Sequence, residues 1–461
     1  MKATIVPGRS AAGKTKLGAI FTQGAIGTPV ITAVQGGDAP GQPAAKYKSF
    51  LDPVISPAGR VAFIGTLQTS KSAKPSLAVF STITGTLARH LQQGQEIPGM
   101  AGIVLKSVSG ISIRGTGLTT QLVVLASITG QDVGKTNNVV LLGVNVFGNV
   151  TKLLRTGEDE LTVDDVESQV TGVTTLTSAK GSTGHGRWQS DSRIAARVTL
   201  ADKRTVLVTI SGNGTVAPLV ASGDDSAPFG NETTWKTLGL PTVGTSNVAA
   251  ALVSATGKDL SKGVDTGLVY TTNASTFSFL ARKGDVAAGT TNAKYASFSE
   301  PLVSSTNGFA FMSNLTGGDT KGKNKTGIWS GTLLPQYQAP SLLARQGDKA
   351  TDSRGEPSTV SWSSFLSLAH PGGANSGPIF LAKVAGKKNN IGLWAQDSSS
   401  KLRQVVRVGD SFGGQILTRM VLLQGTAGVS GATRSFNDAG GVGLLLSFKD
   451  KSQAIYYLGI P

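Results

Sequence analysis

The chain has 461 residues, a formal net charge of +16, 60 glycines, 6% aromatic residues and no cysteine. The lack of cysteine excludes disulfides, thiolate metal sites and a thiol nucleophile, and no apolar run approaches the about 20 residues that a membrane-spanning helix needs. Abundant Thr, Ser and Val beside Gly, without helix-rich stretches, predict an all-β protein.

The first residues predict a pair of strands, at 2–7 and 17–22. Between them, Gly8-Arg9-Ser10-Ala11-Ala12-Gly13-Lys14-Thr15 matches the phosphate-binding pattern G-x4-G-K-[ST]. A phosphate loop requires a helix that begins at the Lys-Thr pair. Because the residues after Lys16 continue as a strand pattern, we predict a loop between two strands and no nucleotide hydrolysis.

A short phrase then returns seven times along the chain. It is an apolar strand, often ending in Arg, followed by Gly and an acidic or amide residue, with glycines at Gly37, Gly94, Gly157, Gly223, Gly284, Gly347 and Gly409. A period near 60 residues, built only from short strands and turns, is typical of β-propellers.

Each repeat contains four predicted strands, which we name A to D. Strand A follows the glycine phrase, and the apolar strands B and C, with Trp329 and Trp394 on C, are joined by a polar B–C loop. Strand D is the phrase itself. Apolar B and C strands suit the middle of a blade. Arginines near the end of D suit its outer edge, where charge discourages pairing with another sheet; they are Arg155, Arg282, Arg345 and Arg407. The repeated Asp is expected to cap its own turn.

The sequence therefore predicts one β-propeller domain over residues 1–461, with seven four-stranded blades closed by the N- and C-terminal strands. The repeats are 38–94, 95–157, 158–223, 224–284, 285–347, 348–409 and 410–461. The last repeat lacks a D strand, so residues 1–37 are expected to close the ring, which removes two open edges. Eight incomplete blades are the alternative.

The order of these motifs resembles known propeller repeats. L-x-R-x-G-D-x-x-P-G, a Pro/Asn-Ala-Gly turn, V-A-F and G-I-W together resemble repeats of secreted bacterial propellers of unknown function, and TolB-type repeats more distantly. The resemblance spans nearly the whole chain, although Gln95 and Glu158 depart from the Gly-Asp form. It implies the fold and a location outside the cell or in the cell envelope, with any leader removed before residue 1. It transfers no catalytic residue.

Basic residues concentrate in the B–C loops, which hold seventeen of them against six acidic residues when the N-terminal loop is included. Because all B–C loops of a propeller emerge on one face, they predict a cationic face that holds an anionic partner by many weak contacts. The alternative is that these lysines only keep exposed loops soluble. The candidate binding residues are Lys14, Lys16, Lys71, Lys74, Lys135, Lys203, Arg204, Lys258, Lys262, Lys321, Lys323, Lys325, Lys387, Lys388, Lys449 and Lys451.

Two classes of function follow. We expect a non-catalytic binding or scaffold propeller, not an enzyme, whose partner is an anionic polymer (an acidic polysaccharide, an envelope polymer or a nucleic acid) or a protein. The alternative is a hydrolase or lyase that acts on glycans in the central channel. Such an enzyme needs carboxylates or an Arg/His cluster on the A strands, and those stretches are mostly apolar, hydroxyl-bearing or Gly.

No catalytic residue, cofactor or metal site is predicted. The histidines His90, His185 and His370 lie in different repeats at different positions. The acidic run from Glu158 to Glu167 lacks the alternating spacing of a calcium loop, so we expect it to be a solvated loop.

Overall fold

The protein is built from antiparallel β-strands. The computed structural model describes residues 2–5, 17–22, 30–51, 53–56, 59–177, 193–258, 260–261, 263–322, 324–371, 377–386, 390–412, 414–422, 436 and 441–460. These residues hold 38 strands and two short 3-10 helices, Gly117–Thr119 and Ala227–Phe229. In these ranges there is no helix whose length and apolar character would allow it to cross a membrane.

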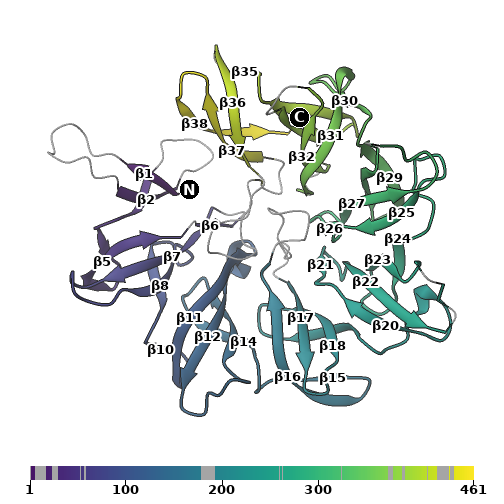
Figure 1. The fold of residues 1–461 in the computed structure, drawn as a ribbon. Coiled ribbons are helices and arrows are strands. Elements are labelled where there is room, and N and C mark those ends of the chain that lie inside the picture. The colour runs from purple at the N-terminus through teal and green to yellow at the C-terminus, as the bar shows by residue number, and fades with distance from the viewer. Residues whose placement is uncertain are drawn as a thin grey trace.

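Seven sheets of four to six strands are the blades of a seven-bladed β-propeller (Figure 1). The first three blades comprise β4 (Asp38–Ala39), β5 (Gln42–Phe50), β6 (Val54–Ile55), β7 (Val61–Gln68), β8 (Ser76–Ser81) and β9 (Ala88–Gln92); β10 (Glu96–Ile97), β11 (Met100–Arg114), β12 (Gln121–Gly130), β13 (Val139–Asn145) and β14 (Val150–Arg155); and β15 (Glu160–Val163), β16 (Val166–Thr175), β17 (Ile194–Leu200), β18 (Thr205–Ile210) and β19 (Val216–Ala221).

The other four blades comprise β20 (Thr233–Leu238), β21 (Thr242–Val243), β22 (Ala249–Gly257), β23 (Thr266–Thr271) and β24 (Ser278–Arg282); β25 (Lys294–Phe298), β26 (Leu302–Val303), β27 (Gly308–Thr316), β28 (Thr326–Thr332) and β29 (Gln338–Arg345); β30 (Lys349–Thr351), β31 (Pro357–Ala369), β32 (Ile379–Val384), β33 (Ile391–Gln396) and β34 (Leu402–Arg407); and β35 (Ser411–Phe412), β36 (Gln415–Val421), β37 (Gly441–Phe448) and β38 (Gln453–Gly459). Each blade follows the predicted order A, B, C, and strand D is the last strand of the first six.

The N-terminal residues form a smaller sheet of β1 (Lys2–Ile5), β2 (Leu17–Thr22) and β3 (Val30–Val34). β2 runs antiparallel to β1, so the residues after Lys16 form a strand and not the helix of a phosphate loop; residues 8–15 lie outside the described residues. Figure 1 places this sheet between the last blade and the first. Within the described residues, β38 is hydrogen-bonded only to β37, and closure of the ring by residues 1–37 stays a prediction.

Deleting residues 1–35 is expected to destabilise the last blade, because the open edge of β38 and the first blade both lose their neighbouring sheet. We expect a lower melting temperature and a tendency to associate, measured by calorimetry and light scattering against the full chain. A truncated protein that stays monomeric and melts at the same temperature contradicts closure by the N-terminal strands.

The glycine phrase joins each D strand to the next A strand by a repeated pair of hydrogen bonds. A glycine N–H donates to an A-strand carbonyl at 2.7–2.9 Å in all seven repeats, as from Gly284 to Tyr295. That same A-strand residue donates back to a turn carbonyl at 2.9–3.0 Å, as from Tyr295 to Asp285. These glycines have positive φ, a conformation that favours glycine. In the first repeat the glycine is Gly36, so the assignment to Gly37 was wrong by one residue.

An aspartate caps the glycine turn in three repeats, in two of them at the predicted position. The Asp224 carboxylate accepts the Ala221 N–H at 2.9 Å and the Asp410 carboxylate accepts the Arg407 N–H at 2.7 Å. In the third repeat the cap is Asp159, which accepts the Arg155 N–H. The same cap is therefore formed from more than one turn sequence.

The core lies between the blades and consists mainly of B and C strands. The five central residues of β13, Val140–Val144, are all buried, and so are the first four residues of β12. Trp329 and Trp394 are fully buried. Each indole N–H donates to a carbonyl at the start of its own blade, Ala288 O at 3.0 Å and Thr351 O at 2.9 Å. The predicted core role of these tryptophans is confirmed.

The D strands are the outer edges of their sheets, but the explanation given for their arginines was wrong for Arg155 and Arg345. Arg155 and Arg345 are buried, with 8% and 6% exposure, and so cannot act as exposed charges against edge pairing. In three blades the arginine Nε donates to a carbonyl that precedes strand C; the acceptors are Asn137 O for Arg155, Val264 O for Arg282 and Asn324 O for Arg345. The arginines hold the B–C loop against the D strand.

Candidate anion-binding face

The structure confirms that the ten described candidate residues belong to B–C loops. They lie in the segments from β7 to β8, β12 to β13, β17 to β18, β22 to β23, β27 to β28 and β37 to β38. Lys14, Lys16, Lys262, Lys323, Lys387 and Lys388 lie outside the described residues. The B–C loops and the D–A turns lie at the same end of the blade. The hydrogen bond from Arg155 Nε, at the end of strand D, to Asn137 O, in the B–C loop, shows this in the second blade.

Nine candidate lysines are exposed to solvent. They are Lys71, Lys74, Lys135, Lys203, Lys258, Lys321, Lys325, Lys449 and Lys451. Within the described part of the chain, none of these nine takes part in an ion pair, whereas lysines elsewhere, such as Lys46 and Lys401, do. The face therefore presents charges that the protein does not itself neutralise. Whether they bind a partner stays a prediction.

Arg204 is the exception among the described candidates. Its guanidinium contacts the Asp202 carboxylate at 2.8 Å and the Asp164 carboxylate at 3.3 Å. The hydrogen bond that Arg204 donates to the Asp202 carboxylate raises the pKa of Arg204. Its charge is balanced within the third blade, which makes it a weak candidate for an external anion.

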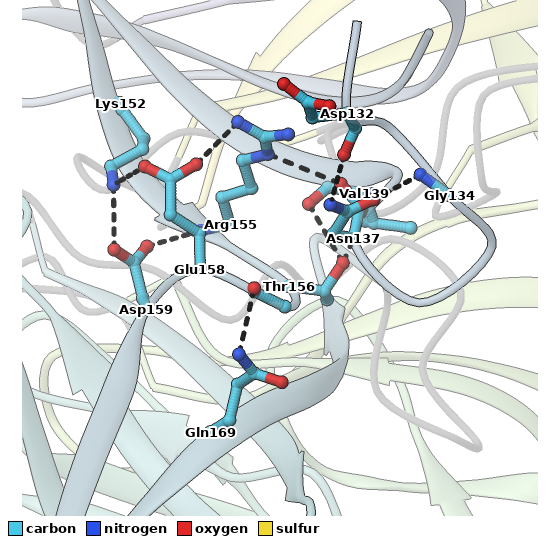
Figure 2. Close-up of polar contacts among 11 residues, drawn as sticks. Asp132, Gly134, Asn137, Val139, Lys152, Arg155, Thr156, Glu158, Asp159 and Gln169 are labelled. Carbon is cyan, nitrogen blue, oxygen red and sulfur yellow. Dashed lines mark hydrogen bonds and ion pairs between the residues drawn. The ribbon is translucent and has the colours of Figure 1, made fainter.

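Two B–C loops are held in shape by an asparagine that the sequence analysis did not identify. The Asn137 side chain accepts the Gly134 N–H at 2.6 Å and donates to Asp132 O at 2.8 Å (Figure 2). Asn324 repeats both contacts, with the Lys321 N–H and with Asp319 O. The pattern Asp-x4-Asn at 132–137 and 319–324 was visible in the sequence. These loops hold Lys135 and Lys321 on an ordered backbone.

The acidic run beside the second blade is partly neutralised. Figure 2 shows Lys152 reaching Glu158 at 2.6 Å and Asp159 at 2.8 Å, while Arg155 pairs with Glu158. The hydrogen bond from Lys152 lowers the pKa of Glu158. An open hollow of about 570 Å³ adjoins this cluster and is lined by Met100, Asp132, Lys152, Arg155 and Glu158 among others. Opposite charges balance there, so this hollow is not an anion site.

Blades are joined near the middle of the ring, where β6, β21 and β26 lie (Figure 1). Asn307, in the A–B turn of the fifth blade, accepts the Thr245 N–H and donates to the Thr245 hydroxyl, both at 2.9 Å. Arg114, on a predicted apolar A strand, is buried and donates to Gln121 Oε1 of its own blade at 2.6 Å and to Ile210 O of the third blade at 3.4 Å. His370 is buried as well, and His185 lies outside the described residues. Asn307 and Arg114 therefore make contacts between neighbouring blades.

Comparison with known families identifies the chain. Residues 6–202 and 197–458 match the family of unknown function DUF7453. The chain belongs to this family. The secreted bacterial origin that the repeats suggested stays a prediction. No curated protein matches the sequence.

Several solved structures resemble the chain at low similarity. An oligogalacturonate lyase in complex with manganese is 9% identical, with a TM-score of 0.40, and the match covers 100% of this chain and 96% of the lyase chain. The oligogalacturonate lyase from Vibrio parahaemolyticus is 10% identical, with a TM-score of 0.39, over 100% and 97% of the two chains. The α-L-arabinanase from Penicillium chrysogenum is 10% identical, with a TM-score of 0.32, over 76% and 93%.

The expectation that the protein is not an enzyme is contradicted by these comparisons. The three similar structures reported above are lyases and a hydrolase of glycans. The propeller fold therefore gives no ground for excluding catalysis. At 9–10% identity the likeness assigns no activity to this chain.

Proposed function

We propose that DUF7453 propellers of this kind bind an acidic polysaccharide on the face formed by the B–C loops. The observation that carries the proposal is the set of nine exposed lysines in these loops, none of them ion-paired within the described ranges. Several weak contacts in a fixed array add up when the ligand is a polymer. A location outside the cell, which the repeat resemblance implies, fits such a ligand.

The composition of the loops favours a polysaccharide over a nucleic acid. The segments 69–75, 131–138, 201–204, 258–265, 317–325, 385–390 and 449–452 contain no Phe, Tyr or Trp. Proteins that bind single-stranded nucleic acid stack bases on aromatic side chains. Among the sixteen candidate residues fifteen are Lys, which acts as a point charge, whereas bidentate phosphate recognition favours Arg. Carboxylate or sulfate groups spaced along a sugar chain match separate point charges.

Replacing Lys71, Lys74 and Lys135 together by Ser is expected to weaken binding about 10- to 100-fold in moderate salt. The salt dependence should also become weaker, because the variant makes fewer contacts and its binding releases fewer counterions. Binding of alginate and of heparin, measured by calorimetry at several salt concentrations, checks this. The fold should be unaffected, because exposed loop changes usually cost within about 0.5 kcal/mol each.

The matched control removes three basic residues at the opposite ends of the blades. Arg60 donates to Thr82 O next to an A–B turn. Lys401 directly precedes the D strand β34 and pairs with Glu356, and Arg354 lies in the β30–β31 turn beside Glu356. The D-strand arginines Arg155 and Arg345 are unsuitable as controls because they are buried. Equal loss of binding in both triple variants points to net charge alone. A wild-type protein that binds duplex DNA but neither polysaccharide overturns the ligand class.

The same samples show whether the protein cleaves what it binds. Chain length of the polysaccharide is followed by gel filtration during incubation, since binding and cleavage of an acidic glycan both begin at such a face. Shortening of the chain adds a hydrolase or lyase activity, the second candidate function; unchanged length with salt-dependent binding supports binding alone.

A further inference from the structure

A β-bulge recurs at the same place in the A strand of every blade. The register with strand B shifts directly after the residue that is bonded to the glycine turn, as between Tyr47 and Ser49 and between Leu105 and Ser107. The other five shifts follow Val170, Trp235, Tyr295, Trp362 and Leu417. A bulge leaves one residue outside the ladder and re-aims its side chain.

The bulge is fixed from both sides. The residue before it exchanges two backbone hydrogen bonds with the glycine turn. In two blades the carbonyl of the bulged residue itself accepts a side-chain amide from that turn, Gln93 Nε2 to Lys106 O at 3.0 Å and Gln346 Nε2 to Ser363 O at 2.7 Å. The bulged position is thus an ordered site for whichever side chain occupies it.

Three blades place a lysine at this position: Lys48 in the first, Lys106 in the second and Lys236 in the fourth. All three are exposed, and none is ion-paired within the described part of the chain. Two residues before Lys48, by contrast, Lys46 is paired with Asp38 at 2.5 Å. The bulge therefore adds uncompensated positive charge on top of that of the B–C loops.

The bulge lysines of the first two blades lie near the B–C loops. Lys46 lies opposite Gln68, the last residue of β7, in the strand register. The Gln68 side-chain amide donates to Lys71 O and Ala73 O inside the loop at 3.2 and 3.0 Å. In the second blade Ile103 pairs with Gly130, the last residue of β12. Lys48 is two residues from Lys46 and Lys106 is three residues from Ile103, which is roughly 7 and 10 Å along the strand at about 3.4 Å per residue.

We propose that Lys48 and Lys106 form a second row of cations behind Lys71, Lys74 and Lys135, and that the two rows bind one extended chain of acidic sugars across the first and second blades. The inference rests on the proposed function and names the path of the ligand. Because the five charges are spread over two blades, a chain of several sugars reaches more of them than a short acid does.

The charge of the third blade ends this path. The β15–β16 hairpin exposes three carboxylates besides the Asp164 that pairs with Arg204, namely Glu160, Asp165 and Glu167, and these like charges repel an anionic chain. The bulged residue of this blade is Thr171. A ligand that crosses the first two blades therefore stops or turns away at the third.

The test compares Lys48→Ser/Lys106→Ser with the control Arg354→Ser/Lys401→Ser. For alginate and heparin of high molecular weight, the bulge variant is expected to bind roughly tenfold more weakly and to lose salt dependence in proportion to two contacts, about 0.7 to 0.9 in logarithmic slope for each. The control variant keeps nearly the wild-type values. For a disaccharide of either polymer, wild-type and bulge variant should bind equally weakly.

The outcomes separate the inference from the function it rests on. If the loop variant Lys71→Ser/Lys74→Ser/Lys135→Ser loses affinity and the bulge variant does not, the second row is refuted while the binding face stands. If the wild-type protein binds neither polymer, the proposed function itself fails. If both bulge and control variants lose the same affinity, Lys48 and Lys106 contribute only net charge, which also refutes the row.

Discussion

Replacing Trp329 by Ala is expected to lower the free energy of unfolding by about 3–5 kcal/mol, the usual cost of removing a large aromatic side chain from a core. The Trp329 ring is fully buried, packs edge-on to Tyr295 at 5.1 Å and stacks on Phe311 at 5.8 Å. The substitution also leaves Ala288 O without the indole donor. Urea unfolding followed by circular dichroism measures the change.

Trp329→Phe is the matched control, because it keeps an aromatic ring and removes the indole N–H. It should cost less than the alanine variant. A loss under about 1 kcal/mol for Trp329→Ala would show that the fifth blade tolerates the cavity by collapsing, contrary to the close packing of this core.

Acid should destabilise the protein through His370 well before the carboxylates titrate. Burial lowers the pKa of His370 from 6.5 to about 4, and a Cβ on Gly308 would lie only 2.7 Å from its Nε2. The group binds its proton more readily when unfolded, so its contribution is complete above about pH 6.5 and is lost as the pH falls toward 4. Between pH 7 and pH 5 the loss is about 2 kcal/mol.

Denaturant unfolding of the wild type and of His370→Gln at both pH values checks this. The variant should lose the part of the pH dependence that belongs to this side chain and keep the part due to His90, whose pKa is also lowered, mainly by burial. Equal slopes in both proteins would assign the acid sensitivity elsewhere.

The repeat made the fold predictable from the sequence. Strand order, the seven blades, the buried Trp329 and Trp394 and the aspartate caps all follow from a phrase that recurs with a period near 60, because each recurrence must satisfy the same backbone bonds. The turn glycine of the first repeat, Gly36 instead of the predicted Gly37, shows where prediction from the repeat fails. In a Gly-Gly pair only the observed φ of +83° identifies the residue in the turn.

The site was less predictable because its chemistry depends on contacts distant in sequence. Arg345 looked like an exposed edge charge, yet its guanidinium contacts Asp319 at 2.5 Å, 26 residues away. That hydrogen bond lowers the pKa of Asp319. Lys48 and Lys106 carried no motif, since a bulge shows only in the register of two strands. The sequence predicted that the loops are positively charged, but it did not predict the ion pair of Arg345 or the positions of the bulges.

The paired bonds of the glycine turns have a consequence for how the chain folds. They join residues close in sequence, from 8 apart for Gly409 and Leu417 to 15 apart for Gly347 and Trp362. Contacts of this range form early and at low entropic cost, so each new blade can be attached to the preceding one as soon as its A strand exists. Hydrogen exchange should then show blades opening as separate cooperative units. The ring would assemble in chain order, and only the last joint would require the two ends to meet.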